Sequence, residues 1–228
     1  MTERELLRLH VEAVWGLTLP ALDEPAREFF LAGSLPPWSL YLGAFAQEQV
    51  AIWHPDVGAE QRMLYREHAR QADVVWDQAL GMRREVVFHA PSIRQEQQAQ
   101  AQQLARILSA EDVDLINIFE AGSALYFLDP HRAPCIGVVV DGRLVSIAHS
   151  SRQTPAACEL GIETLPEARR RGYAAAATIL WTATVQQKWL TPIYSAFAWN
   201  TASLQLAKAT GYVPSIDGVY GPVPEAAD

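Results

Sequence analysis

Three consecutive arginines, Arg169, Arg170 and Arg171, stand directly before Gly172 and a run of alanines in this 228-residue chain. Arginine carries a permanent positive charge and binds phosphate oxygens through paired hydrogen bonds. Gly172 permits close approach of a ligand to the backbone and dihedral angles that other residues avoid. A helix that begins here would add unpaired N–H groups and the positive end of its dipole. The stretch predicts a pyrophosphate-binding loop, with a solvated helix start as the alternative interpretation.

Other patterns that could support chemistry are weak in this sequence. The six histidines show no metal-ligand spacing such as H-E-x-x-H, so we expect ordinary surface or core histidines and no metal site. The segment 121–125, Ala-Gly-Ser-Ala-Leu, does not fit the nucleophile motif G-x-S-x-G. The functional prediction therefore depends on the arginine–glycine stretch and on the elements that hold it.

The second half of the chain has the pattern of a small α/β sheet around this stretch. Two apolar runs separated by Asp141-Gly142 are typical of a tight hairpin. A strand before the arginines and a helix after them would form a parallel crossover to the next strand. We expect strands at 136–140, 143–150, 157–164 and 193–199, a helix at 173–187, a helix from Asn200 or Thr201 to Thr210, and a last hairpin at Asp217-Gly218.

The first half is predicted to be mainly helical from its apolar spacing and its capping residues. Ser92 with Gln95, and Ser109 with Asp112, have the spacing of capping boxes. We expect helices at 3–14, at 23–31 with Asp23 as its cap, at 59–83, at 93–108 and from Ser109 to about Gly122, with a loop at 34–38 and a strand at 86–90.

Composition limits the class of protein. Half of the residues are hydrophobic, which suffices for a globular core, and a net charge of -8 argues against a nucleic-acid binder. Cys135 and Cys158 have no C-x-x-C spacing, so we expect buried free thiols in a reducing compartment. Residues 1–10 lack the apolar core of a signal peptide, and no apolar run approaches the roughly 20 residues of a membrane span. We expect a cytoplasmic protein.

Two motifs resemble those of the GCN5-related N-acetyltransferase (GNAT) family. Arg-Arg-Arg-Gly-Tyr-Ala at 169–174 is similar to the family's pyrophosphate motif [QR]-x-x-G-x-[GA]. The segment 199–212 resembles its later motif, in which N-x-x-S or N-x-x-A is followed by a glycine and an aromatic residue. One helix and one strand separate the two motifs, as in the family. The resemblance covers roughly residues 110–220, and the two motifs in this context are more specific than either alone.

The resemblance implies an α/β fold of the acyl-CoA N-acyltransferase type: a mixed, mostly antiparallel sheet with a parallel β–α–β crossover, preceded by a mainly helical amino-terminal region. It divides the chain into residues 1–108, expected to shape the acceptor site, and an acetyl-CoA-binding domain at 109–228. The backbone of 162–164 would contact the pantetheine arm and thioester, and the loop would hold the pyrophosphate. The implied cofactor-binding residues are Ile162, Glu163, Thr164, Arg169, Arg170, Arg171, Gly172, Tyr173, Ala174, Asn200 and Ser203.

The residues for proton transfer depart from the family pattern. Many members place a tyrosine four residues before the glycine of the later motif, and some place a glutamate on the preceding strand. Those positions are Ala207 and Ser195 here. Glu159, on the third strand, is the candidate general base, directly or through water, with an exposed edge carboxylate as the alternative. The other candidate acids or orienting residues are Ser203, Tyr194 and Tyr220, for which packing or capping is the alternative.

These observations predict an N-acetyltransferase that moves an acetyl group from acetyl-CoA to a primary amine by direct attack. The acceptor would be a small molecule, a peptide terminus or a lysine. We expect no metal, nucleic-acid or membrane partner, and a homodimer is the one oligomer considered. The rival hypothesis, which the residues at the two departing positions favour, is a non-catalytic acyl-CoA-binding or sensor protein on the same fold. A purely structural partner module, the third hypothesis, would bind no acetyl-CoA.

Overall fold

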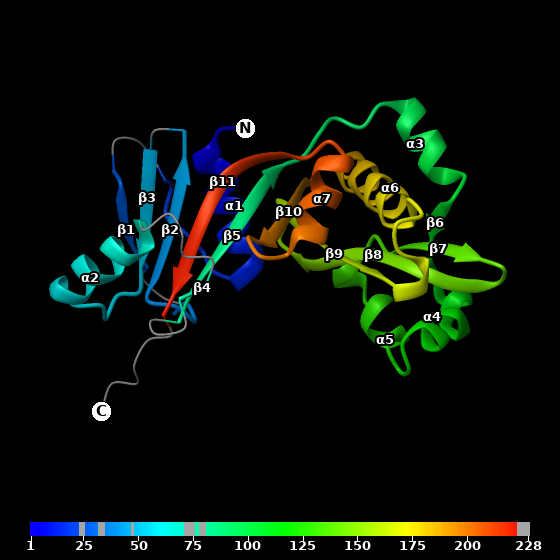
Figure 1. Cartoon of the computed structure of the whole chain (residues 1–228), viewed down its shortest axis with the longest axis horizontal. Coiled ribbons are helices and arrows are strands. Elements are labelled where there is room, and N and C mark those ends of the chain that lie inside the picture. The colour runs from blue at the N-terminus through cyan, green and yellow to red at the C-terminus, as the bar shows by residue number, and fades with distance from the viewer. Residues whose placement is uncertain (23–25, 32–34, 47, 71–75, 78–80, 223–228) are drawn as a thin grey trace. The chain divides into compact units, whose positions relative to one another are not determined.

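A computed structural model describes residues 1–22, 26–31, 35–46, 48–70, 76–77 and 81–222. Its contacts separate two compact units (Figure 1). The amino-terminal unit comprises Met1–His89, Ser195–Leu204 and Pro214–Asp228, and the central unit comprises Ala90–Tyr194 and Gln205–Val213. Neither unit is one continuous stretch of chain, because the segments after Tyr194 alternate between the two.

The amino-terminal unit is a sheet with helices. Its elements are α1 (Glu3–Trp15), β1 (Glu28–Phe30), β2 (Leu40–Phe45), β3 (Glu48–Trp53), α2 (Ala59–Arg70), β4 (Trp76–Asp77), β5 (Met82–His89) and β11 (Val213–Gly221). The strand order is β1-β3-β2-β11-β5, and β4 pairs with β5. β1 runs parallel to β3, whereas β2 is antiparallel to both β3 and β11.

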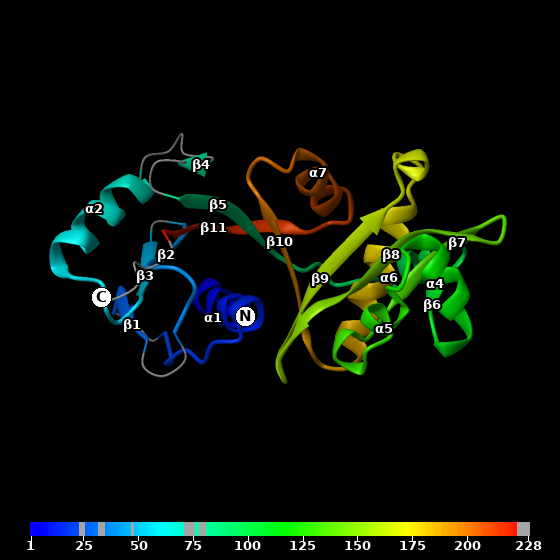
Figure 2. The same ribbon diagram turned by 90° about the horizontal axis from the view of Figure 1, so that it is seen from below.

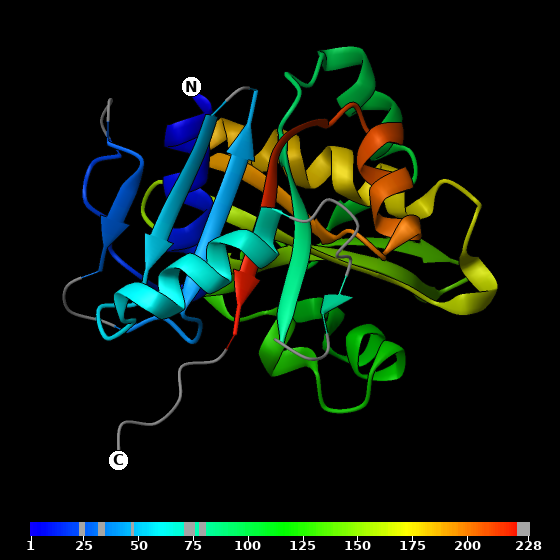
Figure 3. The same cartoon turned by 60° about the vertical axis from the view of Figure 1, so that its left-hand side comes forward.

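The helices α1 and α2 cover opposite faces of this sheet (Figure 3). Thr2 caps α1, because its hydroxyl accepts a hydrogen bond from the Glu5 N–H at 3.1 Å. Leu7 of α1 packs on β2 so closely that a Cβ at Gly43 would lie 3.0 Å from its Cδ1. Tyr65 of α2 packs against a cluster that includes Leu42. Burial of both helix faces against apolar strand residues therefore holds the unit together.

The central unit surrounds a second set of strands. Its elements are α3 (Gln95–Gln102), β6 (Ala105–Ile107), the 3-10 turns η1 (Ala110–Asp112), η2 (Pro130–Arg132) and η3 (Pro166–Ala168), α4 (Val113–Phe119), α5 (Ala124–Phe127), β7 (Ile136–Val140), β8 (Arg143–Gln153), β9 (Ala157–Thr164) and α6 (Tyr173–Gln187). β10 (Thr191–Phe197) begins in this unit, and α7 (Thr201–Ala209) ends in it. The strand order is β10-β9-β8-β7-β6.

β9, α6 and β10 form the parallel crossover of the central unit (Figure 2). α6 packs on one face of its sheet, where Trp181 Nε1 donates to Ser150 Oγ at 3.3 Å. α4 and α5 pack on the other face through a cluster that includes Ile116, Phe127 and Ile147 (Figure 1). The loop between β9 and α6 thus begins on a strand that is held on both faces.

The predicted fold class is confirmed: the sheets are mostly antiparallel, and β9 to β10 is a parallel crossover. The predicted strand at 157–164 and helix at 173–187 agree with β9 and α6 at both ends. The hairpin is also confirmed, with Asp141 at φ 51° and Gly142 at φ 74°, the backbone of a type I′ turn. Cys135 and Cys158 are buried free thiols, as expected.

Several predictions for the first half are wrong. Residues 28–30 are not helical, because Glu28–Phe30 pairs as β1 with β3; the predicted cap Asp23 lies outside the described residues. The expected helix at 59–83 ends at Arg70, and the chain from Met82 is strand β5; 71–75 and 78–80 lie outside the described residues. The helix expected at 93–108 ends at Gln102, since 105–107 pair with β7, and Gln97 rather than Gln95 closes its first turn.

The predicted hairpin at Asp217-Gly218 is also wrong. β11 runs straight through this dipeptide, and its residues pair with Ala44 and Gly43 of β2. Gly218 is needed for packing rather than for a turn, because a Cβ there would overlap the Tyr41 hydroxyl. The capping box of Ser109 and Asp112 is confirmed, although it begins a 3-10 turn that leads into α4.

Candidate functional site

The arginine loop, residues 166–172, connects β9 to α6 within the central unit. Arg170 and Gly172 both have left-handed backbone, with φ of 61° and 82°. Gly172 is the N-cap residue of α6, and no side chain caps this helix end. The first backbone bond of the helix runs from Ala176 N–H to Gly172 O at 3.0 Å. The N–H groups of the first turn therefore lack a side-chain acceptor, which is the condition under which a helix start binds an anion.

The space over the loop is open. A Cβ built at Gly172 would meet no atom within 4 Å. Arg169, Arg170 and Arg171 are all exposed, and Arg169 Nε donates to the Thr164 carbonyl at 3.4 Å. In the described part of the chain, none of these three guanidinium groups is paired with a carboxylate. The residues present fit a phosphate-bearing ligand, since positive charge, open space and N–H donors occur together.

Near the end of β9, two backbone N–H groups point away from the neighbouring strand β8. Leu165 N–H donates to Val145 O at 3.0 Å, so alternation along the strand directs the N–H groups of Ile162 and Thr164 to the opposite edge. The ladder between β9 and β10 on that edge ends at the pair Glu159 and Ile193. The predicted pantetheine contacts of 162–164 therefore lie beyond the last β9–β10 pair, where a ligand can take the place of a strand.

Asn200 and Ser203 belong to the amino-terminal unit, at the start of α7. The Asn200 side-chain oxygen accepts a hydrogen bond from the Ser203 N–H at 3.1 Å, which confirms Asn200 as the cap of this helix. Capping occupies that oxygen and leaves the amide nitrogen as the donor that Asn200 could offer a ligand. The predicted cofactor role of both residues stays a prediction.

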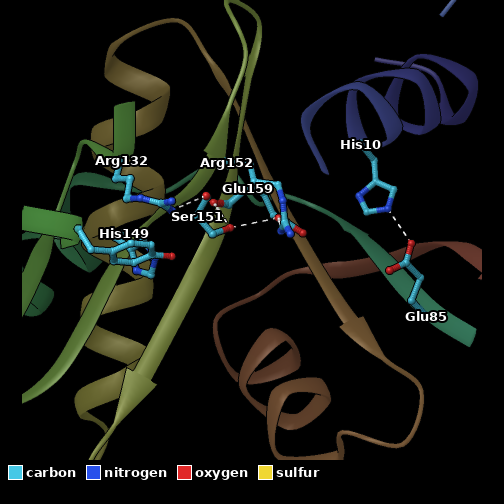
Figure 4. A network of polar contacts seen from close by, with 8 residues as sticks. His10, Glu85, Arg132, His149, Ser151, Arg152 and Glu159 are labelled. Carbon is cyan, nitrogen blue, oxygen red and sulfur yellow. Dashed lines mark hydrogen bonds and ion pairs between the residues drawn. The ribbon is translucent and has the colours of Figure 1, made fainter. Parts of the chain in front are cut away.

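Glu159 is buried rather than exposed at an edge, with 8% of its side chain accessible. Its Oε2 accepts hydrogen bonds from Arg152 Nη1 at 2.9 Å and from Ser151 Oγ at 3.1 Å (Figure 4). Ser151 occupies the irregular position where the β8–β9 register shifts, and this bulge turns its hydroxyl toward Glu159. These two hydrogen bonds hold the Glu159 carboxylate in one orientation.

Glu163 lies four residues further along β9 and therefore on the same face as Glu159. Partial desolvation, followed by the charge of Glu120, raises the pKa of Glu163. β9 thus carries two carboxylates with different surroundings: Glu159 is bound by Arg152 and Ser151, whereas Glu163 forms no ion pair among the described residues.

A histidine that the sequence analysis did not single out lies opposite Gly161, on β8. His149 is 3% exposed, and its Nδ1 has no hydrogen-bond partner among the described residues. Its Nε2 lies 3.5 Å from the Tyr126 hydroxyl, and a Cβ at Gly161 would come within 2.7 Å of the same nitrogen. Burial, together with the charge of Arg132, lowers the pKa of His149 to about 4. The ring is therefore neutral at pH 7.

Arg132 connects this histidine to the bulge of β8. Its guanidinium lies 3.6 Å from the centre of the Tyr126 ring, and its Nη1 donates to the Ser151 carbonyl at 2.7 Å (Figure 4). Cation–π contact and hydrogen bond together fix Arg132 against α5 and β8. Arg152 and Glu159 are partners in the β8–β9 register, across the turn that contains Thr154-Pro155. No local pattern indicates the partners of His149.

The remaining candidates are packed residues. Tyr194 is 2% exposed and contacts Tyr212 edge-on, with ring centres 5.2 Å apart. Tyr220 belongs to the amino-terminal unit and stacks on Tyr41. Ala207, at the position where many relatives carry tyrosine, is fully buried. Packing is therefore the immediate role of both tyrosines.

A metal site and a membrane span are two further features that the described residues could contain. No group of three or more His, Cys, Asp or Glu side chains there is placed to hold a metal ion. None of the helices in the same residues has the length and apolar character that crossing a bilayer requires.

Several solved structures are similar to this chain. The chain resembles a GNAT-family structure from Novosphingobium aromaticivorans (21% identity, 61% of this chain, 63% of that chain, TM-score 0.46) and a GCN5-related N-acetyltransferase-like protein from Streptococcus suis (13%, 96%, 98%, 0.48). An acetyltransferase from the GNAT family of Colwellia psychrerythraea reaches a TM-score of 0.50 at 13% identity, covering 75% of each chain. At 13% identity the likeness to the Colwellia psychrerythraea structure supports the fold alone. No curated protein matches the sequence.

The family-level evidence comes from the sequence of the central part of the chain. Residues 123–217 match the model of the GNAT acetyltransferase family. This segment contains β9, the arginine loop, α6 and the Asn200 segment. Residues 123–217 therefore resemble the GNAT acetyltransferase family in sequence, and the parallel crossover and the uncapped, arginine-flanked start of α6 lie within this segment.

Proposed function

We propose that this chain is an acetyl-CoA-dependent N-acetyltransferase whose acceptor is a primary amine on a small molecule, a peptide terminus or a lysine. One observation carries the proposal: the segment that matches the acetyltransferase family holds an open, uncapped helix start beside three exposed arginines. A diphosphate ligand satisfies the unpaired N–H groups and the positive charge at once.

The donor would be bound by residues of one continuous segment. The arginine loop and the first turn of α6 would hold its pyrophosphate. The N–H groups of Ile162 and Thr164 would face its pantetheine arm, as their direction away from β8 suggests. A backbone N–H fixed on a strand is a suitable donor to the thioester oxygen, because it needs no rearrangement as negative charge develops there.

Acetyl transfer joins the amine nitrogen to the acetyl carbon and breaks the carbon–sulfur bond, so one proton must pass from nitrogen to sulfur. Glu159 is the proposed base for this proton, acting directly or through water. Its bonds with Arg152 and Ser151 oppose the role and make a water-mediated path the simpler one. We further propose that residues 1–108 shape the acceptor site.

A non-catalytic acyl-CoA-binding protein is the second candidate function. The observations that favour it are the carboxylate of Glu159, bound by Arg152 and Ser151, and the alanine at position 207. Such a protein would retain the phosphate-binding loop and lack a path for the proton.

Release of free CoA thiol from acetyl-CoA across a panel of primary amines tests the proposal. We expect release with at least one amine and none without protein. Acetyl-CoA binding by calorimetry without thiol release would support the second candidate instead. Absence of both binding and release would exclude the two together and leave a structural role.

A further inference from the structure

A cavity of about 470 Å³ lies on the sheet of the amino-terminal unit. Residues of β2, β5, β11 and the segment 198–204 line it. Its wall is mostly apolar, with Ala44, Val86, Ala198, Leu204 and Ile216 among the lining residues. Small-molecule sites commonly have this size and an apolar wall with few polar groups.

Arg84 and Asp217 are the charged residues of the lining. Arg84 Nε donates to Asp217 Oδ1 at 2.7 Å, and a second bond joins Nη2 to Oδ2. Both side chains keep part of their surface open, 25% and 39%, so that a ligand in the cavity can reach them. Their backbone is fixed, because the Arg84 carbonyl accepts from Ala198 N–H at 2.9 Å and Asp217 pairs with Ala44 of β2.

The pairing of opposite charges restricts the ligand. A simple amine would approach Asp217 but place its positive charge beside Arg84, and a simple carboxylate would meet the reverse conflict. A zwitterion with its two charges on neighbouring groups can face both side chains. Its apolar remainder would then lie against Ala44, Val86 and Leu204, where burial is favourable. We propose that this cavity binds a free hydrophobic α-amino acid, such as leucine.

A second groove on the same sheet has a different character and supplies a control. It is lined by Arg27, Arg66, Arg70, Glu28 and Glu48, among other residues. Arg66 and Glu28 form an ion pair there, comparable in kind to Arg84 and Asp217. Both grooves therefore contain an arginine–carboxylate ion pair, and they differ in the apolar wall of the first cavity. In our proposal this wall selects a hydrophobic ligand.

All residues that line the first cavity belong to the amino-terminal unit. The proposal therefore does not depend on acetyl-CoA binding, for which the arginine loop of the central unit is the proposed site. An amino acid bound here and an acetyl donor bound there can be measured separately.

Calorimetric titration of the full chain with leucine and three analogues tests the proposal. The analogues are N-acetylleucine and 4-methylpentanoate, which lack the ammonium group, and 3-methylbutylamine, which lacks the carboxylate. Leucine is expected to bind, and each analogue to bind at least about tenfold more weakly, the effect of losing one charged hydrogen bond. Equal affinity for any analogue overturns recognition of the zwitterion, and absence of leucine binding overturns the site.

Variants locate the binding. Asp217→Asn is expected to weaken leucine binding about tenfold or more, and Leu204→Ser severalfold. Glu28→Gln removes the matched ion pair from the second groove and is expected to leave leucine affinity unchanged. An equal loss in Glu28→Gln and Asp217→Asn would contradict the assignment. Acetyl-CoA binding without leucine binding would overturn this proposal alone, whereas leucine binding without acetyl-CoA binding would overturn the proposed function alone.

Discussion

Acid should destabilise this protein through His149. The ring is 3% exposed, its Nδ1 has no partner among the described residues, and burial with the Arg132 charge lowers its pKa to about 4. In the unfolded chain a histidine titrates near 6.5. Between these two values the unfolded state binds more protons than the folded state, so the free energy of unfolding falls as the pH decreases.

The size of the effect follows from the two pKa values of His149. At pH 7 both states are mostly neutral, and the contribution is small. At pH 5 the difference in proton binding lowers the free energy of unfolding by about 2 kcal/mol, and below pH 4 the loss reaches about 3 kcal/mol. His149→Gln cannot titrate, so this variant should lose about 2 kcal/mol less stability than the wild type between pH 7 and pH 5.

Urea unfolding at pH 7 and pH 5 measures this difference. For each protein, the free energy of unfolding at pH 5 is subtracted from that at pH 7. This difference cancels any effect of the substitution on stability that does not depend on pH. His131→Gln, at an exposed histidine nearby, controls for the substitution itself. The same pH dependence in the wild type and in His149→Gln would refute the reasoning.

Three further predictions concern packing, catalysis and thiol reactivity. Gly218→Ala should destabilise the protein by about 1–3 kcal/mol, because the new methyl overlaps the Tyr41 hydroxyl, and Tyr41→Phe should recover part of the loss in a double-mutant cycle; additive effects would contradict the clash. Glu159→Gln should lower kcat about 100-fold in the thiol-release assay without weakening acetyl-CoA binding, and an unchanged kcat would exclude Glu159 as the base. Burial raises the pKa of Cys135 to about 12 and also raises the pKa of Cys158, so thiol reagents should label both far more slowly in the folded than in the unfolded protein; equal rates would show that they are accessible.

The elements around the arginine loop could be predicted because their signals are local. The Asp141-Gly142 turn, the apolar run of β9 and the glycine before α6 each act within a few residues. The strands of the amino-terminal unit depend on distant partners: β1 pairs with β3, and β2 pairs with β11 from the far end of the chain. Residues 28–30 of the helix predicted for 23–31 therefore form a strand instead, through a pairing that no local pattern shows.

The candidate site likewise has a part that the sequence predicts and a part that only the fold reveals. The loop of Arg169 to Gly172 is contiguous, so residue type and order were enough to predict an anion site there. The surroundings of Glu159 depend on a bulge that places Ser151 beside it, and those of His149 on helix α5 packing over β8. Register shifts and packing of this kind are set by the whole fold, and for that reason the burial of both residues had to come from the structure.

Calorimetric titration of acetyl-CoA tests the central claim, that the uncapped start of α6 and its arginines hold the donor's pyrophosphate. Gly172→Ala adds a methyl group into open space and a backbone cost of about 1 kcal/mol from φ of 82°, whereas Gly172→Glu also adds negative charge at the proposed phosphate site. We expect binding by the wild type, weaker binding by Gly172→Ala and none by Gly172→Glu. An unchanged dissociation constant in Gly172→Glu would contradict the claim.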